Sequence, residues 1–179
     1  GIYLENITNK FQNIEIFGVC DLIRERAERA VEKYNIPKLY ETMHDMFADP
    51  DVDLVLNITR PYEHFEVSKA ALLAGKPVYS EKPLGATWEE GLELVRIAEE
   101  QGLWIGGAPD TFLDGSTQLA RQIIESGIVG TPVMVDAMLS RSYQHERNYL
   151  GSEKRFAFHR HGGIIFDMGS YYLTEMVFL

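Results

Sequence analysis

The stretch VDLVLNITRPYEHFEVSKAALLAGKPVYSEKP, residues 52–83, decides the fold. The apolar runs at 52–58 and 76–80 are short, and they predict buried strands. The segment 63–75 between them has apolar residues at helical spacing and ends in Gly75, which predicts a helix closed by a glycine. A strand, a helix and a second strand in this order predict two parallel strands joined by a right-handed crossover.

The same alternation continues on both sides of this stretch. We expect further strands at 14–20, 38–40 and 103–109, and helices between Ile23 and Tyr34, at 41–50 and at 87–102. Thr87 and Glu90 predict a capping box at the start of the last of these helices. The regular alternation ends near Pro109, after which we expect a helix at 116–127, a strand at 131–140, a loop at 141–163 and a helix at 169–179.

Composition limits the classes of function. The 179 residues are 45% hydrophobic and 25% charged, which is typical of a globular protein with a packed core. The net charge of −10 disfavours nucleic acid and anionic membranes as partners and favours a small-molecule substrate. Cys20 is the single cysteine, so an intramolecular disulfide is excluded and we predict a cytoplasmic protein. We find no signal-peptide pattern and no apolar run long enough to span a bilayer.

Four segments with chemically useful side chains follow the predicted strands. Ligands of doubly wound sheets bind beyond the carboxyl ends of the strands, so a single location accounts for all four segments. They are Asp21, the turn NITRPYEH (57–64), the turn SEKP (80–83) and APDTF (108–112).

Asp21 ends the strand that follows the first helix. A carboxylate in this position accepts hydrogen bonds from the ribose hydroxyls of NAD and repels the 2′-phosphate of NADP. We therefore favour NAD, although Arg24 keeps NADP open. The alternative is that Asp21 only caps a helix that begins at Leu22.

The turn 57–64 offers Asn57, Thr59, Pro61 and His64. Thr59 and the turn backbone are suited to contact a cofactor, with Pro61 fixing the path of the chain. The alternative is an ordinary helix start with an incidental histidine, and a lone histidine favours that alternative.

The turn SEKP is the sharpest signal. An ammonium held at a strand end can bind a substrate hydroxyl and assist proton transfer, which is the role we predict for Lys82, with Glu81 orienting it. The alternative is a surface Glu–Lys pair of little energetic value. Farther along the chain, Asp167 and Tyr171 are four residues apart and share a helix face, although their spacing alone favours a helix cap and a core aromatic residue.

These segments together resemble the Gfo/Idh/MocA oxidoreductase family over nearly the whole chain. The matching segments are VYSEKPL (78–84), with the family's Glu-Lys-Pro motif, LNITRPYEHFEV (56–67), APDTFLDG (108–115) and GGIIFDMGSYYLTEMV (162–177). Each motif is weak alone, but four in the right order are specific.

The resemblance implies an α/β, Rossmann-type dinucleotide-binding domain at 1–109, followed by the start of an α+β domain at 110–179 whose sheet forms homo-oligomer contacts. It implies NAD(P), a sugar, polyol or cyclitol substrate, and oxidation of a secondary alcohol. Lys82 is then the catalytic and substrate-binding lysine, Asp167 is its carboxylate partner, and no metal is expected. Two alternatives remain: an NAD-dependent glycosidase of the same family, and a non-catalytic dinucleotide-binding regulator.

The chain departs from the family pattern in three places. Tyr171 stands where the family has histidine, so we predict that its hydroxyl points toward Lys82 and takes part in proton transfer, while Tyr172 packs elsewhere. The alternative is proton transfer through Lys82 or a water alone. His161 stands where glycine is common. The first strand and the Gly-x-Gly-x-x-Gly loop are absent, and Gly1 matches the last glycine of that loop. A sheet without this central strand has two unpaired inner edges, so we expect a fragment of a longer polypeptide.

Overall fold

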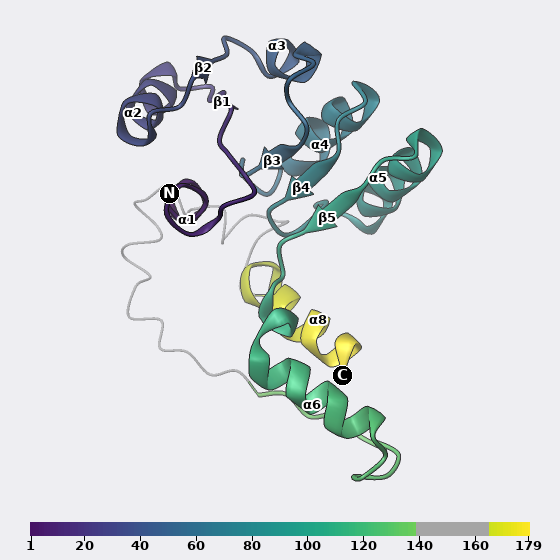
Figure 1. Ribbon diagram of the computed structural model, residues 1–179. Helices are drawn as coiled ribbons and strands as arrows, with labels where there is room; N and C mark the ends of the chain where they lie inside the picture. Colours follow the sequence, from purple (N-terminus) through teal and green to yellow (C-terminus); the bar gives the residue numbers. More distant parts are fainter. Residues whose placement is uncertain (139–164) are drawn as a thin grey trace, which may run out of the picture. The chain divides into compact units, whose positions relative to one another are not determined.

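The computed structural model describes residues 1–138 and 165–179 (Figure 1). The chain divides into two compact units. The first unit comprises Gly1–Asn57, Glu66–Tyr79 and Leu94–Ile105, and the second comprises Ile58–Phe65, Ser80–Glu93 and Gly106–Leu179. The domain boundary predicted at residue 109 stays a prediction.

The strands form two parallel sheets. Strand β1 (Gly18–Val19) pairs in parallel with β2 (Lys38–Leu39). Strands β3 (Val55–Asn57), β4 (Val78–Ser80) and β5 (Ile105–Gly107) form a second sheet in the order β3-β4-β5. Helices separate these strands along the sequence, which confirms the predicted α/β fold of Rossmann type.

The helices of this α/β region have ends set by local hydrogen bonds. They are α1 (Ile2–Lys10), α2 (Arg24–Tyr34), α3 (Met43–Ala48), α4 (His64–Leu73) and α5 (Trp88–Gln101). The predicted capping box of α5 is present, because Thr87 Oγ1 accepts from the Glu90 N–H at 3.2 Å and Glu90 Oε2 accepts from the Thr87 N–H at 3.3 Å. Gly75 (φ 81°) and Gly102 (φ 64°) end α4 and α5 in the left-handed conformation that glycine adopts without strain.

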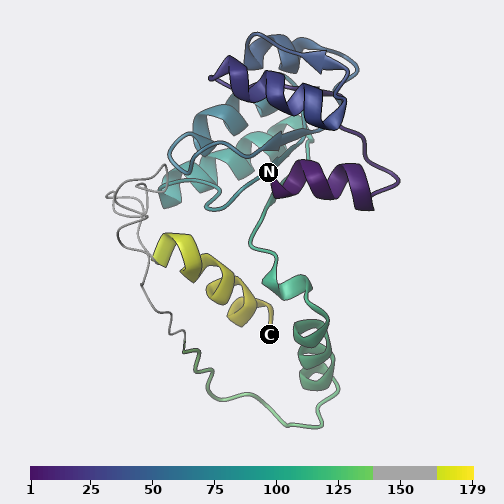
Figure 2. The same cartoon turned by 90° about the vertical axis from the view of Figure 1, so that its left-hand side faces the viewer.

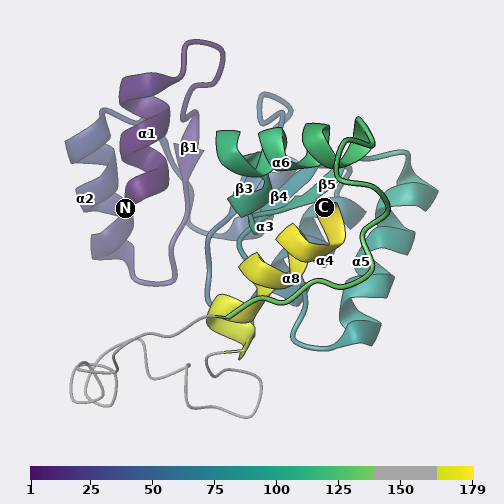
Figure 3. The ribbon, with the colours of Figure 1, turned by 90° about the horizontal axis from the view of Figure 1, so that it is seen from below.

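The core of the first unit is built by alternation in the strands and by one face of each helix. In β3, Val55 and Asn57 are buried while Leu56 between them is partly exposed. Leu72 of α4 and Leu94 of α5 have no exposed surface. Helix α1 lies beside α2, as Figure 3 shows.

Two predicted strands differ from the structure. Only Gly18 and Val19 of the segment 14–20 are paired, because β2 offers a partner to these two residues alone. The strand predicted at 131–140 is wrong for residues 131–138, which are exposed and have no strand structure. Without a neighbouring strand, an apolar segment cannot form the ladder of hydrogen bonds that defines a strand. The predicted loop 141–163 lies outside the described residues.

In the second unit, a short helix η1 (Thr111–Leu113) and helix α6 (Gly115–Glu125) follow β5, as Figure 2 shows. The chain also contains a π-helical turn η3 (Ile165–Gly169), which continues into helix α8 (Ser170–Phe178). Thr117 of α6 donates a hydrogen bond to Glu175 Oε1 of α8 at 2.8 Å, and Arg121 donates to the Phe178 carbonyl. These bonds hold α8 against α6.

Candidate functional site

Lys82 lies at the centre of a polar cluster in the second unit. It lies two residues after the end of β4, and its side chain is only 10% exposed. The ammonium donates to Asp167 Oδ1 at 2.8 Å and also to the main-chain carbonyl oxygen of Asp167 in η3. This pair joins residues 85 positions apart in the sequence. The sequence had left open an exposed ion pair between Glu81 and Lys82, whereas the Lys82 ammonium pairs with Asp167 in a partly buried position.

Glu81 contacts Lys82 through the backbone. Its Oε2 accepts a hydrogen bond from the Lys82 N–H at 2.9 Å, while the Lys82 ammonium pairs with Asp167. The carboxylate of Glu81 therefore shapes the turn that carries Lys82. This turn contains a cis peptide bond between Lys82 and Pro83.

Tyr171 presents its ring face to the lysine. The Lys82 Nζ atom lies 4.9 Å from the centroid of the Tyr171 ring, a cation–π geometry. We had predicted an approach through the tyrosine hydroxyl, whereas the contact described between the two side chains is through the ring. Thr111 Oγ1 donates to the Tyr171 carbonyl at 2.9 Å and so links α8 to η1. The sequence placed Thr111 in the candidate segment APDTF (108–112), but it could not reveal the contact with Tyr171, which is 60 residues away.

The turn after β3 and the turn after β4 meet at His64. The His64 ring is 1% exposed, with Nδ1 2.7 Å from the Pro83 carbonyl oxygen and Nε2 3.1 Å from the Thr59 carbonyl oxygen. The Thr59 side chain is exposed and Pro61 is partly buried. The cluster of the second unit thus contains Thr59, His64, Glu81, Lys82, Asp167 and Tyr171.

Asn57 and Asp21 belong to the first unit. The Asn57 side chain is 2% exposed and donates to Ser68 Oγ of α4 at 2.9 Å, so this contact fastens β3 to α4. Asp21 is exposed at the carboxyl end of β1, and its Oδ1 accepts from the Ile23 N–H at 2.8 Å. Helix α2 begins after Ile23, so Asp21 forms a turn before the helix rather than a cap at Leu22. The roles of both residues toward a cofactor stay predictions.

The surroundings of Asp21 are acidic. Burial raises the pKa of the neighbouring Cys20 thiol, and the carboxylates of Asp21, Asp45 and Glu41 raise it further. Arg24 pairs with Glu28 at 2.8 Å and with Glu41. An exposed carboxylate in a negative field suits the two ribose hydroxyls of NAD and opposes a 2′-phosphate. The carboxylate acceptors at the end of β1 therefore fit the ribose hydroxyls of a dinucleotide.

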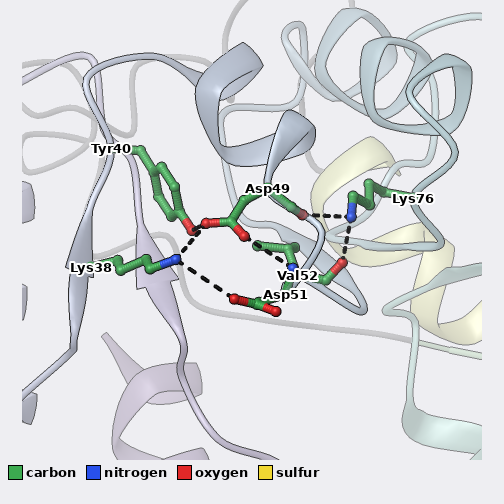
Figure 4. A network of polar contacts seen from close by, with 6 residues as sticks. All are labelled: Lys38, Tyr40, Asp49, Asp51, Val52 and Lys76. Atoms are coloured by element: carbon green, nitrogen blue, oxygen red, sulfur yellow. Dashed lines mark hydrogen bonds and ion pairs between the residues drawn. The ribbon is translucent and has the colours of Figure 1, made fainter.

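A polar network that the sequence had not suggested lies in the first unit (Figure 4). Asp49 accepts hydrogen bonds from Lys38 Nζ and from Tyr40 Oη, each at 2.7 Å. Lys38 and Tyr40 hold the pKa of the Asp49 carboxyl well below its usual range. Burial, and then the hydrogen bond to Asp49, raise the pKa of Tyr40 to about 12. Lys76 donates to the main-chain carbonyls of Asp49 and Val52, so the network joins β2 to the turns before β3 and β4.

The described residues contain neither a candidate metal site nor a membrane-spanning helix. No group of His, Cys, Asp and Glu side chains within residues 1–138 and 165–179 is arranged to hold a metal ion. No helix in this part of the chain is long and apolar enough to cross a membrane. His161 lies outside the described residues.

Parallel strands that alternate with helices place this protein in the Rossmann-type α/β class. Residues 2–106 match the GFO_IDH_MocA family, an oxidoreductase family with an NAD-binding Rossmann fold. The match covers more than half of the chain, so the chain belongs to this family. The resemblance inferred from the sequence motifs is confirmed.

The relatives include dehydrogenases of cyclitols. Inositol 2-dehydrogenase of Salmonella typhimurium is 34% identical over 136 residues, which are 74% of this chain and 40% of that protein. An uncharacterised oxidoreductase of Schizosaccharomyces pombe is 32% identical over 180 residues, with 99% of this chain and 47% of that protein covered. The chain thus spans less than half the length of these relatives.

Solved structures agree on the fold. An NAD-binding oxidoreductase from Klebsiella pneumoniae superposes with a TM-score of 0.82 at 27% identity, covering 92% of this chain and 44% of the other. Scyllo-inositol dehydrogenase from Lactobacillus casei, solved with NAD(H) and scyllo-inositol, also gives 0.82, at 21% identity, covering 99% of this chain and 52% of the other. At that identity the second likeness supports the fold alone.

Proposed function

We propose that the full-length protein transfers a hydride between NAD and a secondary alcohol of a cyclitol, polyol or sugar. The observation that carries the proposal is the partly buried pair of Lys82, in the turn after β4, and Asp167 of η3. The inositol 2-dehydrogenase activity of relatives with up to 34% identity supports the substrate class.

The proposed chemistry gives each described residue a separate task. NAD, when bound, supplies the acceptor for the hydride that leaves the carbinol carbon. Lys82 binds the substrate hydroxyl and takes part in removing its proton. Asp167, whose Oδ1 atom lies 2.8 Å from the Lys82 ammonium, accepts a proton from Lys82 in turn. Tyr171 supports the charge of Lys82 with its ring face. Glu81 holds the Lys82 backbone.

The proposal also covers the cofactor and the domains. Asp21 selects NAD over NADP, as its acidic surroundings favour. Residues 1–109 form the dinucleotide-binding domain, and residues 110–179 begin an α+β domain that contributes to substrate binding and to homo-oligomer contacts. The match of residues 2–106 to a family with an NAD-binding Rossmann fold supports the assignment of the first domain.

The test is turnover by the full-length protein with NAD and a panel of cyclitols, polyols and sugars, followed by NADH absorbance. We expect oxidation of at least one cyclitol or polyol. Lys82→Ala should lower kcat by ~10²–10⁴-fold, the usual contribution of an acid–base group, while NAD affinity changes little. Lys33→Ala, which alters an exposed lysine of α2, is the matched control.

Two results would overturn the proposal. A loss of only a few fold in kcat on Lys82→Ala would remove Lys82 from the proton path. Cleavage of a glycoside without net NADH formation would replace the dehydrogenase with an NAD-dependent glycosidase.

A further inference from the structure

His64 occupies an unusual position for a residue at the start of a helix. It is the first residue of α4, yet its side chain is 1% exposed. Its two ring nitrogens face carbonyl oxygens of two different turns, Nδ1 toward Pro83 at 2.7 Å and Nε2 toward Thr59 at 3.1 Å. A carbonyl oxygen only accepts, so each contact is a hydrogen bond in which the ring nitrogen is the donor when it carries the hydrogen.

The shorter of the two contacts holds the turn that carries Lys82. Pro83 follows Lys82 immediately, and its ring leaves little freedom to the chain between the two residues. The turn is thus held from two sides, by Glu81 at the Lys82 N–H (2.9 Å) and by His64 at the Pro83 carbonyl (2.7 Å). The direction in which the lysine side chain leaves the backbone depends on both anchors.

We propose that His64 is a positioning residue that aims the Lys82 ammonium at Asp167 through the Pro83 carbonyl. This rests on the proposed function of Lys82 and differs from the sequence-based expectation that His64 contacts the cofactor. A misplacement of about 1 Å in a reacting group can cost ~10²-fold in rate. Loss of a backbone anchor one residue from Lys82 is therefore expected to lower kcat strongly.

A pair of amide variants separates the two ring contacts. The amide nitrogen of asparagine stands close to the position of Nδ1, and that of glutamine stands close to the position of Nε2. His64→Asn therefore keeps a donor for Pro83, whereas His64→Gln keeps a donor for Thr59. In the full-length protein we expect His64→Asn to retain kcat within a few fold and His64→Gln to lose roughly 10–10²-fold, with similar NAD affinity in both.

The accessibility of Lys82 gives a second measurement that needs no turnover. Labelling with an amine-reactive reagent, followed by peptide mass spectrometry, reports how firmly the ammonium is held. We expect faster labelling of Lys82 in His64→Gln than in His64→Asn or the wild type, with labelling of Lys33 unchanged as the internal control. This measurement stands even if no substrate is found, so it separates failure of the positioning role from failure of the proposed function.

Three outcomes would overturn the proposal. Equal kcat and equal Lys82 labelling in the two variants would show that the Pro83 contact does not position the lysine. A weaker NAD affinity with unchanged kcat would show that His64 acts in cofactor binding rather than in positioning Lys82. Equal losses of thermal stability in both variants, without a difference in Lys82 labelling, would leave His64 with a purely structural role.

Discussion

At the scale of single residues, Lys82 meets its neighbours through different atoms. Its backbone N–H bonds Glu81, its ammonium pairs with Asp167, and the same ammonium lies over the ring of Tyr171. The sequence placed Glu81 and Lys82 side by side and suggested that the carboxylate orients the ammonium. The structure assigns the two acids separate tasks, since Glu81 holds the turn and Asp167 holds the charge.

Tyr171 provides the first prediction at this scale. Tyr171→Phe keeps the ring that faces Lys82, so we expect kcat to stay within a few fold of the wild type. Tyr171→Leu removes the cation–π contact, which is worth about 1–2 kcal/mol in a partly desolvated site, so kcat should fall by roughly tenfold. Steady-state kinetics of both variants, with Tyr172→Phe as the control for loss of a neighbouring hydroxyl, measure the difference. If Tyr171→Phe is as slow as Tyr171→Leu, the hydroxyl takes part in proton transfer, as the sequence had suggested.

At the scale of elements, local signals predicted helix ends well. Gly75, Gly102 and the pair Thr87–Glu90 each act within a few residues, and each is found where it was expected. The strand at 131–140 was predicted from apolar composition, but a strand depends on a distant partner that composition does not reveal.

The network around Asp49 illustrates the same limit. The sequence predicted only a helix at 41–50 in this region, yet Asp49 joins β2 through Lys38 and Tyr40 (Figure 4). Its main-chain carbonyl accepts from Lys76, 27 residues away. Contacts of this range follow from the packing of strands and turns, which no local pattern encodes.

Tyr40 gives this network a testable dependence on pH. Its folded pKa of about 12 lies above the unfolded value of about 10. The stabilising contribution of the protonated phenol is thus fully present below pH ~10 and is lost as the pH rises toward ~12, because the unfolded chain releases its proton first. We expect the urea concentration at the unfolding midpoint of the full-length protein to decrease as the pH rises from the lower to the higher of these two values. The decrease should be smaller in Tyr40→Phe.

The matched control is Tyr62→Phe, which removes the hydroxyl of an exposed tyrosine in the turn after β3. If the alkaline loss of stability is the same in Tyr40→Phe as in the wild type, the Tyr40–Asp49 hydrogen bond does not stabilise the folded state.

At the scale of the whole molecule, the described strands form two parallel sheets, β1–β2 and β3–β4–β5. The α/β fold and the family could be inferred from the sequence, because the alternation of strands and helices and the order of the motifs are properties of the sequence itself. The ring-face contact of Tyr171 and the double anchor of His64 could not, because they depend on side-chain orientation in a site built from distant segments.

Cofactor choice is a property of the whole protein, and Asp21 provides its test. Asp21→Asn keeps an oxygen that can accept from the Ile23 N–H, so the turn before α2 is preserved while the negative charge is lost. We expect the ratio of kcat/KM for NAD over that for NADP to fall by roughly tenfold, equivalent to about 1.4 kcal/mol of lost repulsion toward the 2′-phosphate. Thermal stability should stay near that of the wild type.

Asp21→Ala is the companion variant, because it removes both the charge and the turn bond. If the carboxylate selects the cofactor, both variants should show a weaker preference for NAD. If Asp21 has only a local structural role, the NAD preference should stay the same in both variants, and only Asp21→Ala should lose thermal stability. The nearby carboxylates of Asp45 and Glu41 remain in both variants, so some discrimination against NADP should persist. A wild-type preference for NADP, or an unchanged ratio in Asp21→Asn, would confine Asp21 to the turn that leads into α2.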